Sequence, residues 1–159
     1  MDDAAAEEEK AVTGAGALAI AALVACAACG GPQPPPFKPV VDVKQMMAGI
    51  VDPSADVVWE SVATIFTKEG VEERRPRTKA EWEHVRNNAM MLAEAGNLLM
   101  MSPRAKDGDE WMKRSQELID SATVALRAAE GQNVEQLLNV GGVIDESCEN
   151  CHKKYWPNY

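Results

Sequence analysis

Two cysteines and a histidine near the C-terminus have the spacing of a cofactor attachment site. Residues Cys148–His152 read Cys-Glu-Asn-Cys-His, the Cys-x-x-Cys-His pattern at which c-type haem is attached. Each thiol can add to one vinyl group of the porphyrin, and the adjoining histidine becomes an iron ligand. Residues three and four apart share one face of a helix, so Cys148, Cys151 and His152 can all reach one cofactor. We therefore predict one covalent haem c with His152 as the proximal iron ligand.

The same residues are compatible with three other interpretations. A structural zinc site needs about four ligands, but the only other histidine is His84, and Cys26 and Cys29 lie in a segment that we expect to be exported or removed. A thioredoxin-like redox pair would follow a strand and begin a helix, a context that we do not find here. Two unmodified surface thiols are the third alternative. We favour haem attachment.

Composition narrows the class of protein. The 159 residues accommodate one ordinary domain and a leader. The net charge of -9 argues against nucleic acid as a partner, because phosphate binding requires a basic surface. No Ser-His-Asp set, paired-carboxylate motif or phosphate loop is visible, so we expect the protein not to be an enzyme.

The first 26 residues are predicted to form a leader. Residues 11–25 are small, apolar and uncharged, and they end directly before Cys26. This looks like the hydrophobic region of a bacterial secretory signal followed by a lipoprotein processing box, although the acidic start departs from the basic one that such signals carry. We expect a signal or lipoprotein leader over residues 1–26, or an uncleaved anchor, and a periplasmic protein that Cys26 can attach to the membrane through lipid.

A proline-rich segment separates this leader from the rest of the chain. Five of the ten residues from Gly30 to Pro39 are proline, which forbids a helix and favours an extended, semi-rigid spacer. We therefore interpret residues 27–39 as a tether and residues 40–159 as the folded domain.

The first part of this domain has helical periodicity. Apolar residues over Val40–Glu69 recur at intervals of three and four, which predicts one buried face: Val40, Val43, Met47 and Ile50. Asp52 can cap a helix that restarts with Pro53 at its first position, so we expect a kink there. The restarted helix should continue to Gly70, and a polar loop over residues 71–77 should follow it.

Three further helices are expected between residues 78 and 155. The second begins at Thr78, which can form a capping box with Glu81; the third covers Glu110–Glu130; the fourth follows its cap Asn133 and carries the cysteines in its last two turns. Their apolar positions step by three and four, as in a helix bundle: Trp82, Val85, Ala89, Leu92, Gly96 and Leu99 in the second, and Trp111, Ser115, Leu118, Ala122, Ala125 and Ala129 in the third. We predict an all-α fold, an antiparallel four-helix bundle with a C-terminal covalent haem c site.

A four-helix domain with Cys-x-x-Cys-His on its C-terminal helix resembles the class II c-type cytochromes, the cytochrome c′ family. The resemblance covers roughly residues 40–156. It implies a haem between the helices, with a residue of the first helix at the iron face opposite the histidine. Members with methionine there are low-spin electron carriers, whereas members with an apolar residue there are five-coordinate and bind small gases such as nitric oxide.

That position falls here on Met46 or Met47. We prefer Met47 as the distal iron ligand because it continues the stripe of Val43 and Ile50, although Met46 fits almost as well and core packing is the ordinary role of such a residue. His/Met ligation would raise the reduction potential and leave no open site. The resemblance then implies electron transfer with redox partner proteins and a possible homodimer through the first two helices. Gas binding (NO or CO) at a five-coordinate haem is the alternative.

Overall fold

The computed structural model describes residues 37–157, which are mostly helical with one small sheet. The elements in chain order are α2 (Val43–Met46), the π-helix η2 (Met47–Val51), α3 (Asp52–Glu60), β1 (Ala63–Thr67), β2 (Gly70–Arg74), α4 (Lys79–Met100), α5 (Glu110–Glu130) and α6 (Val134–Tyr155). The predicted leader with Cys26 and residues 27–36 of the predicted tether lie outside the described residues. Residues 37–39 have no regular secondary structure. None of the helices in the described part combines the length and apolar character needed to cross a bilayer.

The first helical region begins at a capping box that the sequence analysis did not identify. The Asp42 carboxylate accepts a hydrogen bond of 2.7 Å from the Gln45 N–H, and the Gln45 side chain accepts one of 3.1 Å from the Asp42 N–H. This arrangement satisfies two N–H groups that a helix start leaves without partners. Val40 lies before the cap and is 92% exposed, so its predicted place on the buried stripe was wrong.

The helix then runs through Pro53 without restarting. Pro53 has no N–H to donate to the carbonyl of Gly49, and its ring crowds that carbonyl. The helix widens before the proline: the Asp52 N–H bonds to the carbonyl of Met47, five residues back. Asp52 itself has helical backbone angles, so the predicted cap and restart at Asp52 were wrong. A π-helical turn accommodates the proline instead.

An antiparallel hairpin follows where the first helix was predicted to continue to Gly70. β1 pairs with β2 in a register that sets Ala63 opposite Arg74 and Thr67 opposite Gly70. Gly70 has a φ of +142°, a backbone conformation open to glycine but not to other residues. β-Branched and aromatic residues in the segment Ala-Thr-Ile-Phe-Thr favour a strand. The predicted helix was therefore wrong beyond Glu60. Residues 71–74 of the predicted polar loop form part of β2, whereas residues 75–77 have no regular secondary structure, as predicted.

The three long helices agree with their predicted bounds and buried faces. The Thr78 hydroxyl accepts a hydrogen bond of 3.2 Å from the Glu81 N–H, and the Glu81 carboxylate accepts one of 2.9 Å from the Thr78 N–H. The Asn133 side chain likewise caps α6 by accepting from the Gln136 N–H. All predicted inner residues of α4 and α5 are buried. Met90 and Met91 lie on the outer face of α4 and are 45% and 49% exposed.

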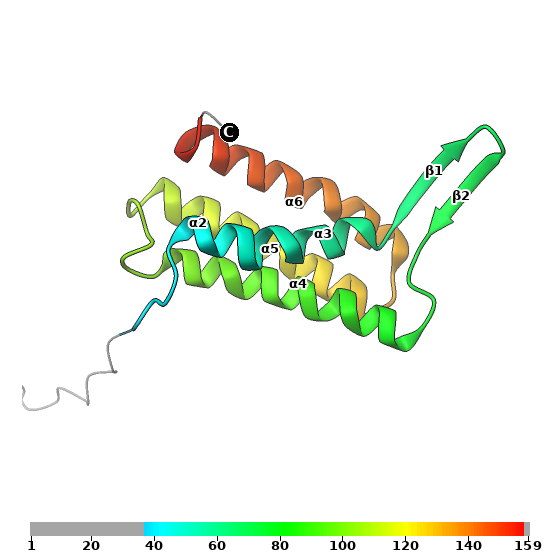
Figure 1. Ribbon diagram of the computed structural model, residues 1–159, viewed down its shortest axis with the longest axis horizontal. Helices are drawn as coiled ribbons and strands as arrows, with labels where there is room; N and C mark the ends of the chain where they lie inside the picture. Colours follow the sequence, from blue (N-terminus) through cyan, green and yellow to red (C-terminus); the bar gives the residue numbers. More distant parts are fainter. Residues whose placement is uncertain (1–36, 158–159) are drawn as a thin grey trace, which may run out of the picture. The chain divides into compact units, whose positions relative to one another are not determined.

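The helices pack against one another in an alternating arrangement. Successive long helices run in opposite directions, and α4 contacts α5, α5 contacts α6, and α3 contacts both α4 and α6 (Figure 1). α4 and α5 approach each other closely at Gly96, where an added Cβ would overlap Ile119 Cγ1. The Trp59 indole N–H donates a hydrogen bond of 3.0 Å to the carbonyl of Gly141, which ties α3 to α6.

Candidate cofactor site

A cavity of about 600 Å³ lies among η2, α3, α5 and the C-terminal half of α6. Its walls include Val51 and Ala55 from the first helical region and Leu118 from α5, all of them buried apolar side chains. This volume is within the range of roughly 300–1,000 Å³ that is typical of ligand and cofactor sites. The cavity is therefore large enough to hold a bound group, and part of its wall is apolar.

All three residues of the C-terminal motif line this cavity. Cys148, Cys151 and His152 are each partly buried. They project into one space because α6 is a regular helix through residue 155, and positions three and four apart share a face. The helical placement on which the motif interpretation depended is confirmed.

Met47 lines the same cavity from η2. It is partly buried, whereas Met46 is fully buried in the core and does not reach the cavity. The structure therefore brings Met47 together with Cys148, Cys151 and His152 and leaves Met46 apart from them. A thioether sulfur and an imidazole are both ligands that haem iron accepts.

Burial keeps both thiols protonated near neutral pH. It raises the pKa of Cys148 to about 11, and the nearby carboxylates of Asp145 and Asp52 act in the same direction, against a hydrogen bond with Ser147. Burial also raises the pKa of Cys151, which the nearby Arg114 guanidinium partly opposes. The two thiols are not joined in a disulfide. Reactive thiols of redox Cys-x-x-Cys pairs have lowered pKa values instead.

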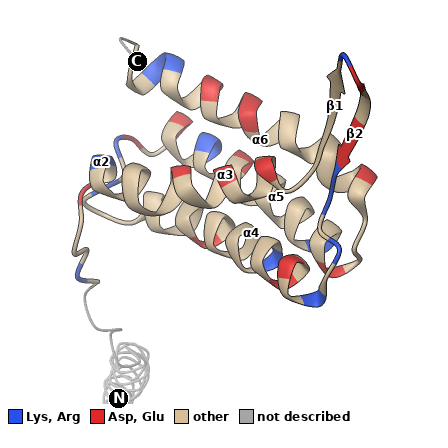
Figure 2. Cartoon of the chain, turned by 45° about the vertical axis from the view of Figure 1, so that its right-hand side comes forward, with Lys and Arg blue, Asp and Glu red and all other residues tan. Residues whose placement is uncertain are grey.

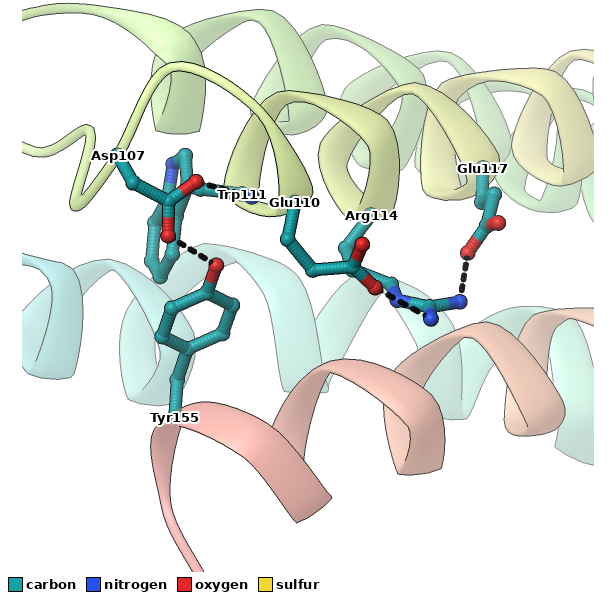
Figure 3. Close-up of polar contacts among 6 residues, drawn as sticks. All are labelled: Asp107, Glu110, Trp111, Arg114, Glu117 and Tyr155. Atoms are coloured by element: carbon teal, nitrogen blue, oxygen red, sulfur yellow. Dashed lines mark hydrogen bonds and ion pairs between the residues drawn. The ribbon is translucent and has the colours of Figure 1, made fainter.

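An arginine of α5 adds a donor to the cavity wall. Arg114 Nη1 donates a hydrogen bond of 2.8 Å to Glu117 Oε2, and Nη2 lies 2.5 Å from Glu110 Oε1 (Figure 3). Both carboxylates raise the pKa of Arg114, and the hydrogen bond to Glu117 has the largest effect. The Nε atom is buried and has no acceptor among the described residues. An unpaired buried donor is unfavourable, so a cofactor that offers an acceptor here would be stabilised.

Sequence reasoning missed this arginine. The available signal was its spacing from Glu110 and Glu117, four and three residues along one helix, which predicts ion pairs. Nothing in the sequence alone shows that the group faces a cavity, because α5 is brought against α6 only in the folded chain.

The last turn of α6 is attached to the start of α5. The Tyr155 hydroxyl donates a hydrogen bond of 2.5 Å to Asp107 Oδ2, and Asp107 Oδ1 accepts one of 2.8 Å from the Trp111 N–H (Figure 3). The rings of Tyr155 and Trp111 meet edge to face with centroids 4.9 Å apart. This contact lies three residues beyond His152, so it holds the helix end that carries the imidazole.

The imidazole of His152 also packs against an aromatic ring. The rings of His152 and Trp156 meet at 73° with centroids 5.7 Å apart. Trp156 lines the cavity although it is 49% exposed. The indole therefore covers one side of the histidine where the cavity meets solvent.

Carboxylates surround the entrance of the cavity. Asp52, Asp56, Asp145 and Glu149 are exposed residues that line it from α3 and α6, and the acidic colouring of both helices is visible in Figure 2. Lys153 also lines the cavity, and its Nζ atom lies 2.6 Å from Glu149 Oε2. An acidic surface of this kind favours approach by a positively charged partner.

Within residues 37–157, no group of three or more His, Cys, Asp or Glu side chains is arranged to hold a metal ion. His84 is exposed, and its carbonyl accepts a hydrogen bond of 2.9 Å from the Asn88 side chain. Comparisons with protein-family models, curated proteins and solved structures found no match to this chain.

Proposed function

We propose that the cavity holds one haem c in an antiparallel four-helix bundle of the cytochrome c′ type, and that the protein transfers electrons. The observation that carries this proposal is the meeting of four side chains in one cavity. Cys148, Cys151 and His152 supply the attachment motif, and Met47 supplies a second ligand type from a distant part of the chain. Helices of alternating direction with a cofactor between them are the arrangement that helix bundles use.

Each residue has a defined role in this proposal. The Sγ atom of Cys148 or Cys151 adds to one carbon of a vinyl double bond, and the thiol hydrogen passes to the other carbon, so no oxidant is needed. His152 and Met47 would supply the imidazole and the thioether that hold the iron of a bound haem.

A bound haem would supply the redox chemistry, in which iron changes between the ferrous and ferric states. The chain contributes two side chains as iron ligands, His152 and Met47, and an apolar wall that limits the access of water. Its carboxylates at the cavity direct a basic redox partner toward the haem. Arg114 contributes a buried donor for an acceptor atom on the cofactor. No catalytic group acts on a further substrate in this proposal.

The proposal is tested by the absorption spectrum of the protein made with a functioning haem-maturation system. Ligation by His152 and Met47 predicts a low-spin ferric spectrum with a weak long-wavelength sulfur-to-iron band, and poor uptake of carbon monoxide by the ferrous form. The double variant Cys148→Ala, Cys151→Ala is the control and should lose all haem to acid-acetone extraction. A wild-type protein that also releases its haem would refute covalent attachment. A high-spin wild type that binds carbon monoxide readily would instead support the gas-binding alternative.

A further inference from the structure

The β1–β2 hairpin lacks the packing that a two-stranded sheet needs. It projects away from the ends of the helices, and neither strand packs extensively against one (Figure 1). Phe66 and Val71 are cross-strand partners, so they lie on one face, and they are 79% and 60% exposed. A two-stranded ribbon is marginally stable in water unless further strands or a helix cover it. The hairpin therefore has the properties of an element that pairs with another chain.

The two edges of this hairpin differ in charge. β1 contains no charged residue and no proline, whereas β2 contains Glu72, Glu73 and Arg74. Figure 2 shows β1 without charge colouring and β2 with both signs. Exposed edges of soluble proteins ordinarily carry charges or proline that prevent pairing. By this criterion the β2 edge is protected and the β1 edge is open.

We propose that β1 pairs in an antiparallel manner with β1 of a second copy of this chain. The hairpins would then form one four-stranded sheet across a two-fold axis. Full overlap of the five residues centres on Ile65, which lies opposite its own copy, and sets Thr64 opposite Phe66 of the second copy. This pairing places no charges opposite one another. The assembly stops at two copies, because both copies use the same surface for the contact.

The other pairings of these strands are less favourable. Full overlap of β2 with β2 of a second copy would set Glu72 opposite its own copy, and like charges directly opposite are destabilising. Pairing β1 with β2 of a second copy leaves a free edge at each end and so forms an open chain rather than a dimer.

The net charge of the chain also favours this site of contact. The whole chain carries -9, which repels a second copy, but residues 63–77 contain four basic and three acidic residues. Two copies that meet at the hairpin therefore meet at a segment without net negative charge. This inference depends on the hairpin alone and is independent of the haem proposal.

Proline substitutions at one cross-strand pair test the proposal. Thr64 and Glu73 are register partners. Because the hairpin loop has two residues, at positions 68 and 69, this is a non-hydrogen-bonded pair. The N–H groups of Thr64 and Glu73 therefore point outward, each away from the other strand. Thr64→Pro removes an outward donor from the β1 edge, and the matched control Glu73→Pro removes one from the β2 edge. Both changes leave the hydrogen bonds within the hairpin in place.

Sedimentation velocity of the full chain over a range of concentrations gives the readout. We expect a reversible monomer–dimer equilibrium in the wild type, a dissociation constant raised about tenfold or more in Thr64→Pro, and little change in Glu73→Pro. A wild type that remains monomeric up to its solubility limit would overturn the proposal, as would equal weakening in both variants.

Cross-linking gives a second test that does not depend on proline. Ile65→Cys should oxidise to a disulfide-linked dimer, because a residue opposite itself in a non-hydrogen-bonded antiparallel pair has a Cα separation of about 4.5 Å. Glu72→Cys, on the opposite strand of the hairpin, is the matched control and should cross-link no more than the wild type. Equal cross-linking of the two variants would contradict pairing through β1.

Discussion

Met46 and Met47 are neighbours in the sequence but face different parts of the molecule. Met46 is 0% exposed and belongs to the core, whereas Met47 is partly exposed and lines the cavity opposite Cys148, Cys151 and His152. Of the two, only Met47 is placed to reach a group bound in that cavity.

This difference predicts opposite phenotypes for the same substitution. Met47→Ala should shift the iron toward high spin, open the site to carbon monoxide, and lower the reduction potential by on the order of 0.1 V, because a thioether favours ferrous iron. The spectrum and a redox titration measure these changes.

Met46→Ala is the matched control. It should leave the spectrum unchanged but lower the free energy of unfolding by about 2–5 kcal/mol, since it leaves a cavity in the core. Spectral changes in Met46→Ala but not in Met47→Ala would reverse the assignment of the ligand.

The contact between Tyr155 and Asp107 predicts a change in stability with pH. The pKa of Tyr155 is raised to about 12 by burial and by the hydrogen bond to Asp107. The Tyr155 contribution is therefore fully present below about pH 10 and is lost as pH rises toward 12. The same hydrogen bond lowers the pKa of Asp107, so the Asp107 contribution is lost only as pH falls below the usual range of an aspartate.

Tyr155→Phe should remove the alkaline part of this dependence and keep most of the ring packing on Trp111. Denaturant unfolding at a series of pH values measures it, and the ionisation of tyrosine followed by ultraviolet absorption gives the pKa directly. If the wild type and Tyr155→Phe lost stability equally between pH 10 and 12, the hydrogen bond between Tyr155 and Asp107 would not be the cause of the alkaline loss of stability.

Two helical glycines predict opposite effects on stability. A Cβ at Gly96 would lie 2.4 Å from Ile119 Cγ1 and 3.0 Å from the carbonyl oxygen of Ser115, whereas a Cβ at Gly142 meets nothing within 4 Å. Gly96→Ala should destabilise the protein by about 1–3 kcal/mol by separating α4 from α5. Gly142→Ala should stabilise it by up to about 1 kcal/mol, because alanine favours a helix. Thermal or denaturant unfolding distinguishes the two, and stabilisation by Gly96→Ala would contradict the close packing.

The predicted leader is tested at the N-terminus of the protein isolated from cells. Export with acylation predicts a mature chain that begins at Cys26 and carries several acyl chains, because a single chain holds a protein to a membrane only weakly. Mass spectrometry of the N-terminal peptide measures this, and Cys26→Ser should abolish the modification. An unmodified chain that begins at Met1 would refute the predicted export.

Much of the helical framework could be predicted because its signals are local. The capping box at Thr78 and Glu81 and the cap at Asn133 lie within a few residues of the helix starts that they determine. The buried stripes of α4 and α5 follow from apolar residues at intervals of three and four. The helical position of Cys148, Cys151 and His152 follows from their spacing in the same way.

The hairpin was missed because its signal was weak. A strand that buries one face alternates apolar and polar residues, but β2 is exposed on both faces and shows no such alternation. Ile65 also continued the helical spacing of Val58 and Val62, which favoured a helix until Gly70.

By itself, the sequence determined the Cys-x-x-Cys-His pattern, the positions of the long helices and the pair of adjacent methionines as candidates, because these depend on residues close together in the chain. Only the tertiary structure showed which of Met46 and Met47 lines the cavity. The π-helical turn before Pro53 adds a residue to the helical repeat and shifts the buried stripe from Met46 to Val51. The tertiary structure also brought Arg114 and Met47 to the cavity that Cys148, Cys151 and His152 line, since α5, α6 and η2 meet only when the apolar faces of the helices pack together.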